Sequence, residues 1–247
     1  DEVNLRRQKL TGKSEGKSYF LSELKNNARL EMDVLIATPR MKKYVEYSAK
    51  ILSVYLKYVS PEDIYVYSVD EVFIDITGYI EDNAVEFVEK MVKDVFDTTG
   101  IIASAGIGEN MYLSKIAMDI MAKKAKPNEH GVRIGELSVK SYREKLWSHT
   151  PITDFWRIGR GYSKSLAKYG IYTMGDIALE SLKKNRVNEG IDLLYKLFGK
   201  NASFLIEHAW GIDSTDIKDI KSYTPEKKSI SEGQVLLRAY NYDEVRT

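Results

Sequence analysis

The chain contains no cysteine among its 247 residues, which excludes disulfide bonds and metal sites built on thiolates. A sequence without cysteine is what we expect of a cytoplasmic protein. No apolar run approaches the ~20 residues that a membrane-spanning helix needs. Lys and Arg outnumber Asp and Glu by one (37 against 36), so the net charge gives no sign of nucleic-acid binding. Any basic surface for a nucleic acid must therefore be local.

Histidine is also scarce. The three histidines, His130, His149 and His208, have no partners at the spacing of metal ligands. We therefore expect them to be surface or packing residues. Ser, His and Asp occur without the sequence context of a nucleophile elbow, so a hydrolase triad is not indicated.

The hydrophobic pattern divides the chain into two regions of different class. The first predicts helices over 41–59, 84–96 and 109–124, and strands on both sides of residue 70, over 100–107 and over 131–134. This order predicts an α+β region, with one mainly antiparallel sheet and helices packed on one face. From residue 151 onward the pattern is helical with short loops, which predicts a small all-α domain. Residues 1–30 are polar and basic, as in a flexible arm or a piece of a larger domain.

Two adjacent carboxylates, Asp70 and Glu71, interrupt a run of β-branched and aromatic residues. The run is typical of two short strands that meet at a tight turn, with both acids at the bend. Neighbouring carboxylates beside strands are costly to bury unless a positive group lies there, and a divalent cation is the usual one. Magnesium prefers such hard oxygen ligands, together with the phosphates of a substrate. The alternative is a hairpin tip with two solvated acids, which the dipeptide alone does not exclude.

Several segments, in order along the chain, resemble the motifs of a known family. They are Pro39–Met41, Tyr58–Ile64, Ser68–Thr77, Ser104–Asn110, Leu113–Asp119, Lys126–Asn128 with Gly131–Val132, and Lys228–Leu236. Together they resemble the Y-family of lesion-bypass DNA polymerases, and most of all its UmuC-like bacterial branch. The resemblance spans nearly the whole chain and is specific, because independent motifs occur in the family's order.

The resemblance implies a polymerase palm followed by a small helix–hairpin–helix thumb. The implied parts are a remnant of the fingers or a polar arm (1–30), the palm (31–150), the thumb (151–215), and a linker with the start of the little-finger domain (216–247). The implied reaction transfers deoxynucleotides from dNTP to a primer 3′-hydroxyl on damaged template DNA, as in the SOS response, with two Mg²⁺ ions. The implied partners are primer-template DNA and dNTP, and a sliding clamp is expected to bind through a C-terminal region outside this sequence.

The resemblance also assigns roles to residues of the first region. By it, Asp70 and Glu71 are the catalytic residues that hold the metal ions, and Lys115 contacts the incoming triphosphate. For Lys115 the alternative is a solvated lysine on the polar face of an amphipathic helix. Asp75, on the same strand as the acids, is expected to have a supporting or structural role.

A second candidate site is the turn Gly159-Arg160-Gly161, which lies between an apolar helix end and a following helix. It resembles a helix–hairpin–helix, in which glycines let the turn approach a phosphate and backbone N–H groups face the DNA. Arg160 and Lys164 would add charge on the same side, so that the contacts position DNA without reading its sequence. The alternative is an ordinary glycine-containing turn between two helices.

One motif of the family is missing. The family begins with a strand that carries a metal-binding Asp and a steric gate against ribonucleotides, and no such segment occurs here. We therefore expect an internal fragment of a polymerase that binds primer-template DNA weakly and has little or no activity alone. One alternative is a nucleotidyl cyclase with a similar palm, which is disfavoured because its Gly-Gly-(Asp/Glu)-Glu-Phe turn is absent. The other is a non-catalytic DNA-binding module in which the acids are structural.

Overall fold

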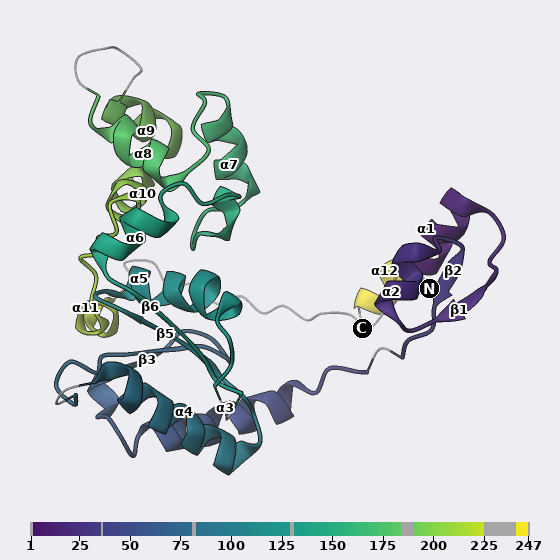
Figure 1. The fold of residues 1–247 in the computed structure, drawn as a ribbon, viewed down its shortest axis with the longest axis horizontal. Coiled ribbons are helices and arrows are strands. Elements are labelled where there is room, and N and C mark those ends of the chain that lie inside the picture. Colours follow the sequence, from purple (N-terminus) through teal and green to yellow (C-terminus); the bar gives the residue numbers. More distant parts are fainter. Residues whose placement is uncertain are drawn as a thin grey trace. The chain divides into compact units, whose positions relative to one another are not determined.

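A computed structural model of the chain describes residues 2–35, 37–80, 83–128, 131–183, 190–224 and 241–246. The chain divides into two compact units, residues 1–41 with 230–247 and residues 42–229 (Figure 1). His130 and the segment Lys228–Leu236, which resembles the start of a little-finger domain, lie outside the described residues. Within the described ranges, no helix is both long enough and apolar enough to cross a membrane.

The first unit is folded, although its sequence is polar. Its elements are α1 (Glu2–Thr11), β1 (Gly16–Ser18), α2 (Leu21–Asn26), β2 (Leu30–Met32) and α12 (Tyr242–Arg246), with β1 and β2 paired in parallel. The Asn4 side chain exchanges two hydrogen bonds with the backbone of Met32, at 3.0 and 2.8 Å. The Arg7 guanidinium donates to three backbone carbonyls in α2, β2 and the turn between them. Of the two alternatives for residues 1–30, these contacts disfavour the flexible arm, because the polar side chains satisfy the unit's own backbone. The assignment as a remnant of the fingers stays a prediction.

The second unit contains four strands among its described residues: β3 (Ile64–Val66), β4 (Val72–Ile74), β5 (Ser104–Gly108) and β6 (Arg133–Leu137). Its α-helices are α3 (Met41–Tyr55), α4 (Ala84–Thr99), α5 (Met111–Ile116), α6 (Val139–Leu146), α7 (Arg160–Ala167), α8 (Met174–Ser181), α9 (Gly190–Phe198), α10 (Asn201–Ala209) and α11 (Ile217–Ser222). Shorter helical turns are η1 (Pro61–Asp63), η2 (Ala117–Met121), η3 (Ala122–Lys124) and η4 (Ile152–Asp154). The single helix predicted over 109–124 is thus divided into α5, a π-helical turn η2 and a 3₁₀ turn η3.

The strands pair in two different ways. β3 and β4 form the antiparallel hairpin that was predicted around the acid pair. β5 and β6 pair in parallel, which requires a crossover, and α5 with η2 and η3 provides it. The prediction of one mainly antiparallel sheet is therefore wrong: over the described residues, the second unit has two two-stranded sheets, one of each kind.

Helices cover both faces of β5, not one face as predicted. Gly106 and Gly108 face α5 so closely that a methyl group on either would overlap the backbone at Ser114. Ala105 and Ile107 alternate with them along the strand and pack in the cluster that includes α4. Figure 1 shows α4 below the strands and α5 above them. The small residues of this segment therefore allow close packing of helix on strand, and this places α5 directly over β5.

The largest hydrophobic cluster crosses the predicted boundary between palm and thumb at residue 150. It joins Tyr112 of α5 and Tyr142 of α6 to Phe155 and to buried residues of α8, α9 and α10. Smaller clusters pack α3 and α4 against the strands. Apart from residues 31–41, both predicted domains thus lie in one compact unit, and their assignment as palm and thumb stays a prediction.

Candidate active site and nucleic-acid interface

The acid pair lies in the loop that joins β3 to β4. The backbone N–H groups of Tyr67 and Ser68 both donate to the Glu71 carbonyl, at 3.0 and 3.1 Å, and close the loop. The Ser68 hydroxyl donates to Asp70 Oδ1 at 2.6 Å and accepts from the Asp70 N–H at 3.3 Å. Asp70 is exposed, whereas the Glu71 side chain is 29% exposed. The loop thus presents two neighbouring carboxylates from a hydrogen-bonded backbone.

Lys115 lies beside the acid pair. Its ammonium is 2.7 Å from Glu71 Oε1 and 3.0 Å from Asp119 Oδ2. The residue is 8% exposed, so the alternative of a solvated surface lysine is wrong. Burial disfavours the charged ammonium, but hydrogen bonds to Glu71 and Asp119 outweigh it and raise the pKa of Lys115. Lys115 is therefore a buried cation that anchors Glu71.

This geometry bears on the predicted triphosphate contact of Lys115. An ammonium has three donors, and two of them are directed at carboxylates, so at most one remains for a phosphate. The triphosphate contact stays a prediction, and the arrangement favours a role in orienting Glu71. The sequence motifs do not single out Asp119 as a residue of this site, although its position four residues after Lys115 on a helix is typical of an ion pair.

The described residues do not contain a group of three or more His, Asp or Glu side chains arranged to hold a metal ion. Asp70 and Glu71 therefore supply two carboxylates to any cation at this loop. On the strand side of the loop, the Asp75 Oδ1 accepts a hydrogen bond from the Thr77 N–H at 2.9 Å. That hydrogen bond lowers the pKa of Asp75 and gives it a structural role in the turn after β4.

An aromatic contact joins the acidic hairpin to the helical region that follows. The Trp156 indole N–H donates to the Tyr67 hydroxyl at 3.1 Å, and the two ring centroids are 5.8 Å apart. The Trp156 ring also lies 5.8 Å from the ring of Phe73 on β4. Tyr67 and Phe73 flank the acid pair, so Trp156 fixes the loop that carries Asp70 and Glu71 relative to the Gly-x-Gly turn.

The Gly-x-Gly turn forms the start of α7, with Gly159 as the capping residue. No side chain caps this end, and Gly159 and Gly161 have open space where a Cβ would be. The first backbone N–H groups of the helix are therefore accessible to an anion. Arg160 and Lys164 are exposed on the same helix. The predicted helix end before the turn is wrong, because the short segment after Pro151 has room for the 3₁₀ turn η4 instead.

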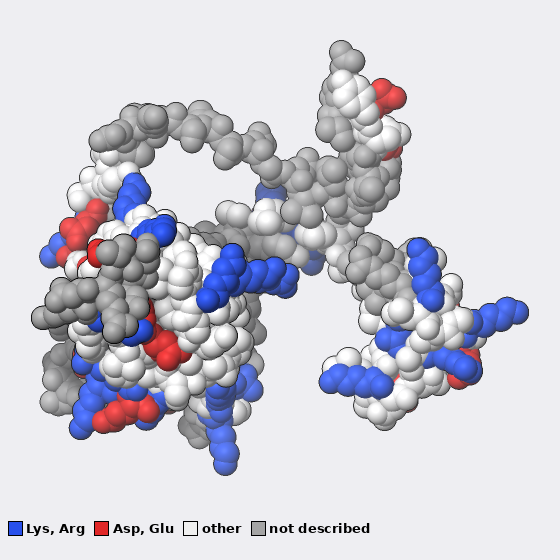
Figure 2. Space-filling view, turned by 90° about the horizontal axis from the view of Figure 1, so that it is seen from above, with Lys and Arg blue, Asp and Glu red and all other residues white. Residues whose placement is uncertain are grey.

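Charges of both signs are mixed on the face of the second unit shown at the left of Figure 2, where Lys and Arg side chains are interspersed with Asp and Glu. A phosphate contact at α7 must therefore come from a few groups, such as Arg160, Lys164 and the backbone N–H groups beside them.

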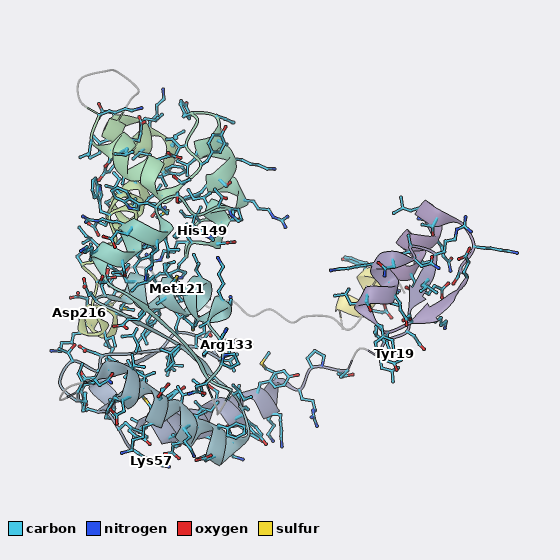
Figure 3. The ribbon with its side chains drawn as sticks, viewed as in Figure 1. Tyr19, Lys57, Met121, Arg133, His149 and Asp216 are labelled. Carbon is cyan, nitrogen blue, oxygen red and sulfur yellow. The ribbon has the colours of Figure 1, made fainter. Side chains whose placement is uncertain are left out.

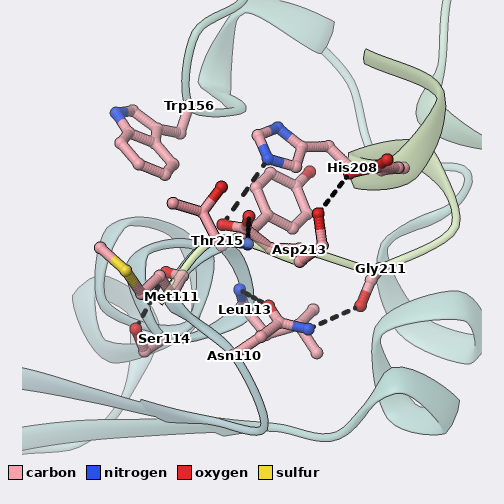
Figure 4. A network of polar contacts seen from close by, with 12 residues as sticks. Asn110, Met111, Leu113, Ser114, Trp156, His208, Gly211, Asp213 and Thr215 are labelled. Atoms are coloured by element: carbon pink, nitrogen blue, oxygen red, sulfur yellow. Dashed lines mark hydrogen bonds and ion pairs between the residues drawn. The ribbon is translucent and has the colours of Figure 1, made fainter. Parts of the chain in front are cut away.

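His208 of α10 is a buried packing residue, as the sequence predicts. The His208 ring stacks on the Tyr112 ring with centroids 4.1 Å apart, and the residue is 3% exposed. Its Nε2 has no hydrogen-bond partner within the described ranges and lies 3.8 Å from Asp213 Oδ2 (Figure 4). Burial lowers the pKa of His208 to about 4, although the charge of Asp213 opposes this. His149, labelled in Figure 3, shares a hydrogen bond with Asp154 at 2.8 Å.

Comparison with known proteins shows which fold and which family the chain is similar to. Residues 21–119, which contain the acid pair and Lys115, match the model of the impB/mucB/samB family. Among solved structures, a Y-family DNA polymerase chimera of Dbh and Dpo4 matches with a TM-score of 0.57 and 25% identity, over 72% of this chain and 47% of that one. The chain is similar to the Y-family DNA polymerases in fold and in sequence. An insertion ternary complex of Dbh DNA polymerase shares the Y-family fold, with a TM-score of 0.58 and 23% identity over 86% of this chain and 55% of that one.

Relatives of known sequence agree with the Y-family match. The protein named UvrX of Bacillus subtilis (strain 168), a UV-damage repair protein by its name, is 30% identical over 85% of this chain and 46% of its own length. DNA polymerase IV 2 of the same organism is 30% identical over 85% of this chain and 47% of its own length. The chain thus spans about half the length of the curated relatives that it matches.

Proposed function

We propose that this chain forms the palm and thumb of a translesion DNA polymerase, which transfers deoxynucleotides from dNTP to a primer 3′-hydroxyl. The observation that carries the proposal is the hairpin loop with adjacent Asp70 and Glu71, in which Glu71 is paired to the buried Lys115. The names of the relatives, DNA polymerase IV 2 and a UV-damage repair protein, support the reaction class. A ternary complex among the similar structures supports DNA and dNTP as partners.

The donor set at the loop fits magnesium. Asp70 and Glu71 offer hard carboxylate oxygens, and Asp70 is exposed with a hydroxyl hydrogen bond from Ser68. One or two carboxylates are typical for Mg²⁺, which completes its shell with substrate phosphates and water. We propose Asp70 and Glu71 as the ligands of two Mg²⁺ ions and Lys115 as the residue that orients Glu71, with its third donor left for the triphosphate. When bound, the ions would lower the pKa of the primer hydroxyl and neutralise the triphosphate.

The proposed DNA interface is the start of α7. Its backbone N–H groups at Gly159, Arg160 and Gly161 bind a backbone phosphate, and the Arg160 and Lys164 side chains add positive charge. Such contacts do not depend on base sequence, which suits an enzyme that must move along its template. We also propose that a sliding clamp binds the full-length protein and that the protein is cytoplasmic. Both of these proposals rest on the sequence alone.

Primer extension tests the proposal in a full-length protein that carries this sequence. We expect extension in magnesium by that protein and none by its Asp70→Ala, Glu71→Ala double variant. A matched control is the Asp97→Ala, Glu144→Ala double variant, which removes two exposed carboxylates from surface ion pairs and should keep the activity. Full activity of the Asp70→Ala, Glu71→Ala variant would contradict the assignment of these two residues as metal ligands.

The second candidate function is a non-catalytic DNA-binding module with a polymerase-like palm. The observation in its favour is that the described residues supply two carboxylates and no larger metal cluster. In that case the full-length protein binds primer-template DNA but does not extend the primer, and loss of Asp70 and Glu71 leaves the DNA affinity unchanged.

A further inference from the structure

A cavity of about 300 Å³ opens beside the start of α7. Its wall carries aromatic rings from three elements: Trp156 from the turn before α7, Tyr162 from α7 and Phe204 from α10. Its polar groups are Arg157, Asn201 and His208. This combination of aromatic wall and few polar groups is typical of a small-molecule site, and the volume is at the lower end for such sites.

Arg157 has an unusual backbone at the mouth of this cavity. It is the one non-glycine residue with a positive φ (68°) in the described part of the chain. The Ile158 N–H donates to the Phe155 carbonyl at 3.1 Å, so Arg157 is the third residue of a β-turn. A turn with positive φ at this position strongly prefers Gly or Asn, because a Cβ there is strained. A strained backbone that persists at a non-glycine residue indicates that the side chain of this residue has a function.

The Arg157 guanidinium is held in place but not neutralised. It lies over the Trp156 ring at 4.5 Å and near the Phe204 ring at 5.6 Å from the centroids. Stacking on rings uses the faces of the guanidinium and leaves its N–H edges for a planar or anionic partner. Across the described ranges, no carboxylate forms an ion pair with Arg157. The exposed cation is therefore available to an external anion.

We propose that this cavity binds one nucleotide, with its base against the wall of Trp156, Tyr162 and Phe204 and its phosphate on Arg157. Contacts of a base with aromatic rings, and with the guanidinium that lies over two of them, do not depend on the identity of the base, so the site should not discriminate strongly among bases. The N–H edge of a guanidinium matches phosphate oxygens in two-point geometry. Asn201 at the rim adds a donor and an acceptor for the base or the sugar. This site goes beyond the proposed polymerase reaction and does not depend on metal chemistry at Asp70 and Glu71.

The nucleotide can come from two sources with the same chemistry, a free nucleotide or an unpaired nucleotide within a DNA strand. We would titrate the 247-residue chain with dAMP and with the single strand dA5, and follow the intrinsic tryptophan fluorescence. EDTA would be present throughout, so that nucleotide held through a cation at the acid pair does not contribute. Deoxyadenosine and inorganic phosphate serve as the half-ligands, each lacking one of the two recognised groups.

The decisive variant is Arg157→Gly. It removes the guanidinium and gives the turn the residue that its conformation prefers, so the melting temperature should equal or exceed that of the wild type. We expect at least a tenfold loss of dAMP affinity in this stable protein. Lys168→Ala removes one positive charge from the exposed end of α7, outside the cavity lining, and should leave the affinity unchanged. Phe204→Leu keeps an apolar side chain without the ring and should weaken binding of dAMP more than of phosphate.

The outcomes separate cleanly. Saturable binding of dAMP or of dA5 that is lost in Arg157→Gly supports the site, and tighter binding of dA5 identifies the strand as the source. Equal affinity for phosphate and dAMP overturns it, because the base is then not recognised. Absence of saturable binding by either probe, or unchanged binding by Arg157→Gly, also overturns it. None of these results depends on whether the full-length protein extends a primer, so failure of the two proposals can be told apart.

Discussion

The Lys115 ammonium lies 2.7 Å from the Glu71 carboxylate and connects helix α5 to the loop of the acidic hairpin. The same ammonium is 3.0 Å from Asp119, so two carboxylates share one buried cation. Removal of this cation leaves the partly buried Glu71 without its partner and Asp119 with the exposed Lys123 alone, which costs more than loss of a surface ion pair.

Lys115→Met therefore has a defined effect on stability. The variant keeps the length of the side chain, and we expect the free energy of unfolding to fall by about 1–3 kcal/mol. Urea unfolding followed by tryptophan fluorescence measures this, because Trp147, Trp156 and Trp210 all lie in the second unit. The control is Lys123→Met. The Lys123 side chain is 71% exposed and its ammonium is 3.4 Å from Asp119, so its loss should change the free energy of unfolding by less than about 0.5 kcal/mol. Equal effects of the two variants would show that Lys115 is not an anchor.

The hairpin and its acids could be predicted from the sequence because they depend on a local pattern. Alternation of β-branched and aromatic residues around Asp70 and Glu71 predicts two strands and a turn without knowledge of the rest of the chain. The pairing of Lys115 could not be predicted from composition, because a lysine on a helix is usually solvated. Its burial results from Gly106 and Gly108, which let α5 lie directly on β5.

Long-range geometry accounts for the errors. The direction of β6 relative to β5 depends on the path of the chain between them, and the pattern of either strand alone does not show it. The positive φ of Arg157 was missed for a similar reason, since arginine at a turn position that prefers glycine gives no signal in the sequence. Polar side chains in the first unit, such as Arg7, are as typical of a flexible arm as of a folded segment, and the sequence alone does not show that they bind carbonyls of their own unit.

Gly106→Ala tests the close packing of α5 on β5. The added methyl group would overlap the Ser114 carbonyl oxygen and the Met118 backbone, so helix and strand must separate. Overpacking of this kind costs about 1–3 kcal/mol, and we expect that loss in the free energy of unfolding. Gly78→Ala is the matched control, because Gly78 has open space at the Cβ position. A stability of Gly106→Ala equal to that of the control would contradict the packing.

Salt dependence tests the proposed phosphate contacts at α7. The Arg160→Ala, Lys164→Ala double variant removes two side chains that we place on backbone phosphates. We expect the slope of log affinity for primer-template DNA against log salt concentration to become shallower by about 2. Fluorescence anisotropy with a labelled duplex at several salt concentrations gives the slope. Lys50→Ala, which removes an exposed charge on α3, should leave the slope unchanged. An unaltered slope in the double variant would place the DNA elsewhere.

His208 predicts how stability depends on pH. Its pKa is lowered from 6.5 to about 4 because the ring is buried, and the nearby Arg157 acts in the same direction while Asp213 acts against it. Between these pH values the unfolded chain holds the proton and the native chain does not, so stability falls as the pH drops from 7 to 5, by about 2 kcal/mol from this group.

The variant His208→Phe separates this effect from that of the carboxylates. A phenyl ring preserves the stacking on Tyr112 but cannot take up a proton. Urea unfolding of wild type and variant at pH 7, 6 and 5 should therefore give stability curves of different slope, with the wild type losing about 2 kcal/mol more than the variant as the pH falls. His149→Gln, at a half-buried histidine bonded to Asp154, should retain the wild-type loss. Parallel curves for wild type and His208→Phe would mean that His208 takes up its proton in the native state as readily as in the unfolded chain, and that burial does not hold the ring neutral.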